Sequence, residues 1–294
     1  MRQLKMTYPE IASVFKKYVQ EHSAPGSNLP GSYVRSINKL NIILKTNTNL
    51  LGKTEDLWVI SDSKRLIEIY EAILDAQKAS DGSFFAGTPT PSYWKKRFYS
   101  SAVIMLRTFF ALNNRQELML AKAAIATDGV ELATELDAVD LPEDQIYWED
   151  DVPMSSKIGK ERLAEIKVRE NQNVFRRIVL RNYCEKCCLT GLPIVEVLRA
   201  SHISEWAKDP INRLNPENGL CLSATYDAAF DRHLISFDED YRLIFSKRLH
   251  EYYTNKAFQE QFMRLEGTRI IMPMKFLPSQ LLLEKHREIM AKEK

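Results

Sequence analysis

The spacing of apolar residues changes at about Tyr183, and this change limits the folds that are open to the chain. Before Tyr183, apolar side chains recur at helical intervals over long segments. After it, short apolar runs alternate with turn-forming pairs such as Thr190-Gly191 and Asn218-Gly219. A helical region followed by short strands and turns indicates an α+β protein. The first helix predicted before Tyr183 begins at the capping box Thr7-Tyr-Pro-Glu10 and has apolar residues at helical spacing to Val19. The others are 33–44, 63–79, 92–112 and 161–181.

The region after Tyr183 is predicted in smaller pieces. Residues 226–232 fit a short helix, and the runs 234–237 and 243–245 fit two strands around the turn at Asp238-Glu-Asp. Two further helices are predicted at 249–265 and 278–292.

The sign of the charge changes along the chain at about Asp151. From Asp128 to Asp151 there are ten acidic and no basic residues, whereas 152–181 holds eight basic and three acidic ones. A change of this kind is typical of a domain boundary. We therefore expect a helical N-terminal domain at 1–125, an acidic connector at 126–156 and a second domain at 157–294.

Composition limits the classes of function. The hydrophobic share of 45% and the lack of a long apolar run favour a soluble protein with no membrane segment and no secretory signal. The net charge of +2 does not by itself indicate nucleic-acid binding. The four cysteines all lie between Cys184 and Cys221, and this clustering favours reduced thiols in a cytoplasmic protein.

One block of residues suggests a chemistry. A histidine, His202, ends an apolar run, Asn218 begins a tight turn sixteen residues later, and Asp227 opens a short helix nine residues further on. Phosphodiester hydrolysis needs such groups, because a neutral imidazole can take a proton from water near pH 7. Carboxylates can hold a hard divalent cation, which neutralises charge on the phosphate.

The same block resembles the HNH endonuclease family, in the branch found in restriction endonucleases. The resemblance runs from Arg169 to Phe245, about a quarter of the chain, with a motif core at 175–245. It rests on Cys187-Cys-Leu-Thr-Gly191, Ala200-Ser-His-Ile203, Asn218-Gly-Leu220 and Phe230-Asp231. It implies a β-hairpin and a helix around one metal ion, and a ββα-metal nuclease domain flanked by helices.

The resemblance also implies roles for single residues. His202 would be the general base, Asn218 the side chain that braces its loop, and Asp227 a metal ligand. Asp231 lies one helical turn later and could share the metal. Asp227 stands where the family often has histidine, and Ser201 precedes the base where many members have a carboxylate or histidine. Such an oxygen-rich set favours Mg²⁺ or Mn²⁺.

Each of these residues also has a simpler structural interpretation. His202 alone would fit a core histidine, Asn218 an ordinary turn, and Asp227 a helix-start carboxylate. Asp231 could make a structural hydrogen bond. Arg213 and Arg232 flank the motif and are expected to contact DNA phosphates, although a solvated charge pattern is the alternative. Cys184 and Cys187 form a Cys-x-x-Cys pair, for which small buried side chains are favoured over a zinc site.

The expected function is metal-dependent cleavage of DNA, as a restriction or defence nuclease and as a candidate homodimer. The rival hypothesis is a non-catalytic DNA-binding or scaffold protein with a decayed HNH fold. Ser201 and the missing third histidine argue for the rival, whereas the survival of the base, the amide and the carboxylate together argues against it. A nicking enzyme or an RNA nuclease is a third reading.

Overall fold

The computed structural model describes residues 8–46, 51–52, 55–79, 83–85, 91–146 and 157–292. The chain divides into two compact units. The first comprises 1–115 and 141–163, and the second comprises 116–140 and 164–294. Over the described residues, no helix is long and apolar enough to cross a membrane.

The first unit is built from helices, as the apolar spacing predicts. Its core holds large side chains that are completely buried, among them Phe15, Tyr33 and Trp58. The rings of Phe15 and Trp58 meet edge to face, with centroids 5.5 Å apart. The helices are α1 Tyr8–Glu21, α2 Leu29–Thr46, α3 Ser63–Lys78, α4 Pro91–Lys95 and the part of α5 Phe98–Ile125 that ends at Arg115.

One predicted helix of this unit is interrupted. The segment 92–112 was expected to be continuous, but α4 ends at Lys95 and α5 begins at Phe98. Arg97 between them has a φ of 57°, in the left-handed region that a continuing α-helix cannot use. Apolar spacing carries across such a break, which is why the sequence does not reveal it.

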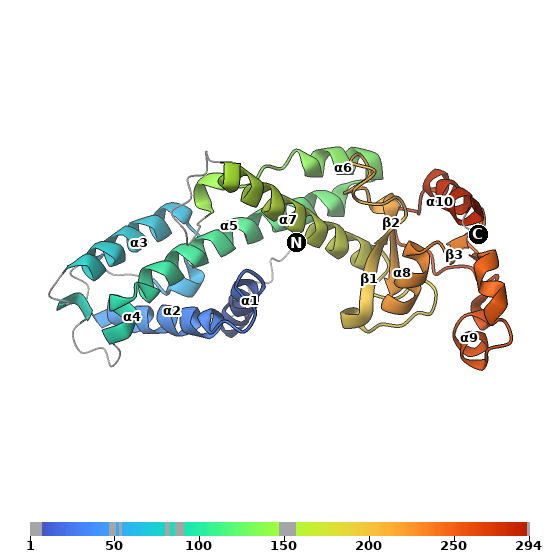
Figure 1. Cartoon of the computed structure of the whole chain (residues 1–294). Coiled ribbons are helices and arrows are strands. Elements are labelled where there is room, and N and C mark those ends of the chain that lie inside the picture. The colour runs from blue at the N-terminus through green and yellow to red at the C-terminus, as the bar shows by residue number, and fades with distance from the viewer. Residues whose placement is uncertain are drawn as a thin grey trace. The chain divides into compact units, whose positions relative to one another are not determined.

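The second unit combines helices with two short antiparallel sheets (Figure 1). Strand β1 Leu198–His202 pairs with β2 Gly219–Ser223, and His202 lies opposite Gly219. Strand β3 Ile235–Phe237 pairs with β4 Leu243–Phe245. Helix α8 Ala224–Asp231 follows β2 directly and packs on both strands of the first hairpin (Figure 1). This β-β-α order agrees with the α+β fold expected for this region.

The remaining elements of the second unit surround that hairpin. They are the end of α5, α6 Gly129–Asp137, α7 Lys157–Asn182 from Ala164 onward, α9 Lys256–Gln261 and α10 Gln280–Lys292, with short 3₁₀ turns at Val195–Val197, Pro216–Asn218, Lys247–Tyr252 and Met263–Leu265. The segment 249–265 is therefore not one helix, because the Asn255 side chain accepts from Phe258 N and begins α9 anew.

The start of β2 lies very close to α7. A Cβ atom on Gly219 would stand 2.5 Å from Val179 Cγ2 and 3.0 Å from Phe175 Cζ. Glycine is therefore required at this point of the Asn-Gly-Leu motif for a packing reason. The contact fixes the hairpin against α7. Phe175, on the same helix, also packs against His202.

The structure describes the expected connector at 126–156 as far as Ile146. Helix α6 lies within it, and its buried residues Leu132, Ala133 and Leu136 belong to the core of the second unit. Residues 147–156 lie outside the described residues. The expected boundaries at 125 and 156 stay a prediction.

Candidate active site

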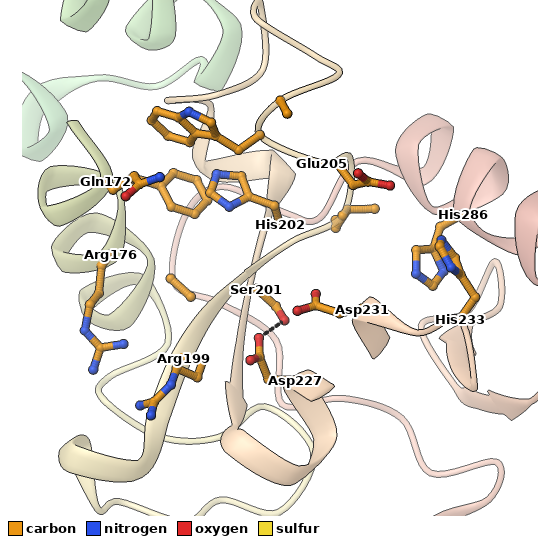
Figure 2. A pocket seen from close by; sticks show the side chains of 15 residues that line it. Gln172, Arg176, Arg199, Ser201, His202, Glu205, Asp227, Asp231, His233 and His286 are labelled. Atoms are coloured by element: carbon orange, nitrogen blue, oxygen red, sulfur yellow. Dashed lines mark hydrogen bonds between the residues drawn. The ribbon is translucent and has the colours of Figure 1, made fainter. Parts of the chain in front are cut away.

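The first hairpin, α7 and α8 line a pocket of about 640 Å³ (Figure 2). Four motif residues contribute to its wall: Ser201, His202, Asp227 and Asp231. The polar and charged side chains that join them are Gln172, Arg176, Arg199, Glu205, His233 and His286. The structure thus brings together the groups that the sequence spreads over thirty residues.

His202 is held on several sides at the end of β1. Its ring stacks on Phe175 with centroids 3.9 Å apart and planes 14° apart, and it meets Trp206 edge to face at 5.4 Å. Its Nε2 lies 3.1 Å from the carbonyl oxygen of Arg213. Because a carbonyl can only accept, Nε2 carries the hydrogen, and a neutral ring keeps Nδ1 as the proton acceptor.

Burial lowers the pKa of His202 below its ordinary value of 6.5. The hydrogen bond to the Arg213 carbonyl and the charge of Asp227 act in the opposite direction and are smaller effects. The ring is therefore neutral at neutral pH, which is the form that can accept a proton.

Asn218 is completely buried and connects both ends of the loop that follows β1. Its Oδ1 accepts from Ser204 N at 2.7 Å. Its Nδ2 donates to Ser204 O at 3.1 Å and to Asn212 O at 3.0 Å. These bonds hold the chain on either side of Trp206. The same loop supplies the Arg213 carbonyl oxygen, which accepts the hydrogen bond from His202 Nε2.

Asp227 lies in the first turn of α8, where the helix dipole favours a carboxylate. Its Oδ1 accepts a hydrogen bond from the hydroxyl of Ser201 on β1 (Figure 2). Ser201, which offers no charge of its own, therefore fixes the carboxylate next to His202.

Asp231 points toward Ser201 and Asp227 from the end of the same helix (Figure 2). Partial burial raises the pKa of Asp231, and the nearby charge of Asp227 raises it further. The charge of Arg232 acts in the opposite direction. A cation beside Asp231 would favour its ionised form.

The residues present fit a hard divalent cation. Among the residues that the structure describes, no group of three or more His, Cys, Asp or Glu side chains is arranged to bind a metal ion. Mg²⁺, however, is commonly bound by one or two carboxylates together with water and substrate phosphate. Asp227 and Asp231 supply such a pair, and the Ser201 hydroxyl adds an oxygen beside them.

The two arginines expected to contact DNA do not line this pocket. Arg213 donates from Nε to Trp206 O at 2.7 Å, and Arg232 donates to Ala228 O at 2.9 Å at the end of α8. The arginines in the pocket wall are Arg176 and Arg199 instead. Alternation along β1 could have indicated Arg199, because it shares a strand face with Ser201.

Two further histidines, His233 and His286, line the pocket. The buried ring of His286, on α10, stacks on Phe230 at 3.9 Å and lies 4.5 Å from His233. It hydrogen-bonds Phe230 O and Ser236 Oγ. Burial, with a smaller effect of His233, lowers the pKa of His286 to about 4. No signal in the sequence connects this final helix with the motif.

The cysteines are reduced. Of the Cys-x-x-Cys pair, Cys187 is buried as expected, but Cys184 is exposed; Cys188 and Cys221 are also buried. Burial raises the pKa of the Cys188 and Cys221 thiols, for Cys221 to about 12. Among the described residues, no group of three or more possible ligands gathers around the Cys184–Cys187 pair to form a zinc site.

The local fold agrees with the class that the motif predicts. A β-hairpin that ends in a histidine, followed by a helix that carries carboxylates, has the β-β-α order expected of an HNH domain. Residues 187–238 match the family model of the HNH endonucleases, so the chain contains an HNH endonuclease domain. No curated protein matches the chain significantly.

Proposed function

We propose that this protein is a divalent-metal-dependent endonuclease that hydrolyses phosphodiester bonds of DNA. The observation that carries the proposal is the fixed, neutral ring of His202 in one pocket with Asp227 and Asp231. The match of residues 187–238 to HNH endonucleases supports the same reaction class.

His202 acts as the general base in this proposal. With Nε2 bonded to Arg213 O, Nδ1 accepts the proton of the water that attacks the scissile phosphate. Phe175 and Trp206 keep the ring in place. Asn218 positions the base indirectly, because it fixes the loop on which Trp206 lies.

Asp227 and Asp231 would hold the cation, with Ser201 orienting Asp227. When bound, Mg²⁺ or Mn²⁺ neutralises charge on the scissile phosphate and on the leaving 3′ oxygen. Arg176 and Arg199 add positive charge to the same wall, so that we assign them the phosphate contacts nearest to the reaction. The products would carry a 5′ phosphate and a 3′ hydroxyl.

For the biological role we propose restriction or defence against foreign DNA in the cytoplasm. Cutting both strands of a duplex at one place is simplest for a protein with two active sites, which favours a homodimer. DNA is the expected substrate in either assembly.

The test is incubation of supercoiled plasmid with the whole chain in Mg²⁺, in Mn²⁺ and in EDTA. We expect cleavage with either ion and none in EDTA. Nicked circles as the lasting product would indicate single-strand cleavage. DNA binding without cleavage in either ion would refute the proposal and favour a non-catalytic protein with a decayed HNH fold.

A further inference from the structure

A second pocket, of about 530 Å³, lies in the same unit between α6, α7 and the loop after β1. Its walls are mainly apolar and include Ala164, Val168 and Leu214. Two cations, Lys167 and Arg213, and one carboxylate, Asp137, also line it. The pocket therefore combines an apolar surface with an excess of positive charge.

Trp206 lines both this pocket and the candidate active site. The edge-to-face contact with His202 joins the indole to the active site, and the guanidinium carbon of Arg213 lies 5.7 Å from its ring centre. The two pockets thus share one side chain as a common wall. A strand whose phosphate lies beside His202 has its next nucleotides within reach of the second pocket.

The chemistry of the second pocket suits a nucleobase. Apolar side chains and a guanidinium plane can stack on the face of any base, whatever its identity. Lys167 and Arg213 can meet the flanking phosphates. Ile211, in the loop that forms one wall, is 75% exposed, and apolar side chains of this kind separate stacked bases when they enter a DNA groove.

We propose that this pocket receives one unstacked base from the nucleotides next to the scissile phosphate. The inference rests on the proposed nuclease function and extends it, because it assigns Arg213 to a neighbouring subsite. In this proposal the loop after β1 has two functions. One side of the loop positions His202, and the other side binds the unstacked nucleobase.

The test measures what it costs to unpair that base. The His202→Ala variant, in EDTA, is bound to a duplex that the wild-type chain cuts. A series of duplexes is prepared for this purpose. In each duplex, one nucleotide next to the cleavage position lies opposite an abasic site, so that its base has no pairing partner. A base that must leave the stack binds more tightly once its pairing has been removed. We expect a gain in affinity of roughly tenfold or more at one position.

Ala164→Phe, made in the His202→Ala background, supplies the discriminating variant. Ala164 is an exposed residue of α7 in the pocket wall, so that a phenyl group there fills the space without removing a core side chain. We expect the gain to disappear in this variant. Ala121→Phe, at an exposed position of α5, is the matched control and should keep the gain. Thermal unfolding checks that both variants fold.

The outcomes separate the two proposals. If the wild-type chain cuts DNA but no position shows a gain, or the gain survives in Ala164→Phe, the base subsite is wrong and the nuclease stands. A pocket for a small effector molecule would then be the better reading. If the wild-type chain cuts no DNA, the nuclease proposal itself fails. Lys167→Ala should also weaken binding and reduce its salt slope by about one, as loss of one phosphate contact requires.

Discussion

The two units of this chain are stabilised in different ways. The first has a core of large apolar side chains, most of them on its helices, with Tyr33 of α2 and Trp58 of the 3₁₀ turn Leu57–Val59 completely buried. The second also has a core, but the loop at its candidate site is held by polar bonds: one amide, Asn218, makes three of them. Substitutions should therefore affect the first unit through stability and the second through activity.

The largest effect is expected at His202. Its replacement by alanine removes the proposed base while β1 and the loop keep their other bonds, so cleavage should fall by about 10²–10⁴-fold with DNA binding and folding nearly unchanged. Plasmid cleavage, gel-shift binding and thermal unfolding measure the three quantities. His250→Ala, an exposed histidine of the same unit, is the control. Wild-type-like cleavage by His202→Ala would exclude it as the base.

The pH profile adds a second readout for His202. Since burial places the pKa of His202 below 6.5, the neutral, active form of the ring predominates at pH 6.5. Cleavage by the wild-type chain should therefore persist at that pH and decline only in more acidic buffer. A decline that begins above pH 7 would indicate a different base.

A smaller effect, on the metal requirement, is expected at Asp227. Loss of one of two carboxylates should raise the Mg²⁺ concentration for half-maximal cleavage by at least roughly 100-fold, more than loss of an outer-shell group costs. Asp227→Asn is compared with Asp231→Asn in a metal titration. Equal shifts would assign both carboxylates to the cation. Asp227→His should move the preference toward Ni²⁺ or Zn²⁺. An unchanged requirement in Asp227→Asn would leave Asp227 as a helix-start residue only.

The sequence predicts the two units unequally well. Helical spacing is a local property, so most helices of the first unit were predictable. The motif also pointed to residues that the structure brings into one pocket, although their roles stay a prediction. The direction of an arginine side chain is set by tertiary contacts, which is why Arg213 and Arg232 were expected near the reaction and Arg176 and Arg199 line the pocket instead. His286 comes to the pocket from the final helix, and spacing cannot indicate so distant a contact.

That distant contact should appear in the pH dependence of stability. The pKa of His286 is about 4 in the folded chain and ordinarily 6.5 when unfolded, so the unfolded state takes up a proton first as the pH falls. Stability is complete above pH 6.5 and is lost between there and pH 4, by about 2 kcal/mol at pH 5. Urea unfolding followed by hydrogen exchange of residues 224–237 measures it.

His286→Asn is the control for this effect. Asparagine carries no titrating group, so the variant should lose much of the difference between pH 7.5 and pH 5, although it is less stable at pH 7.5. The first unit, whose exchange is followed at residues 29–46, should show no matching loss. A pH response of equal size in both units would show that His286 does not account for it.

The smallest effect comes from two glycines that both lie in the first turn of a helix. A Cβ on Gly31, in α2, would meet only the end of the Arg35 side chain at 3.5 Å. A Cβ on Gly129, in α6, would stand 2.4 Å from Asn215 Oδ1 and 2.7 Å from Glu217 Cγ. That oxygen accepts from Glu217 N and caps the turn that presents Asn218.

Gly31→Ala should therefore stabilise the first unit by about 0.5 kcal/mol or leave it unchanged, because alanine lowers the entropy of the unfolded chain. Gly129→Ala should destabilise the second unit by about 1 kcal/mol, through overpacking, and should lower cleavage more than DNA binding. The catalytic effect follows because displacement of Asn215 disturbs the turn that begins at Pro216 and hence the loop that receives His202. Equal, purely thermal effects of the two substitutions would show that α6 does not position the site.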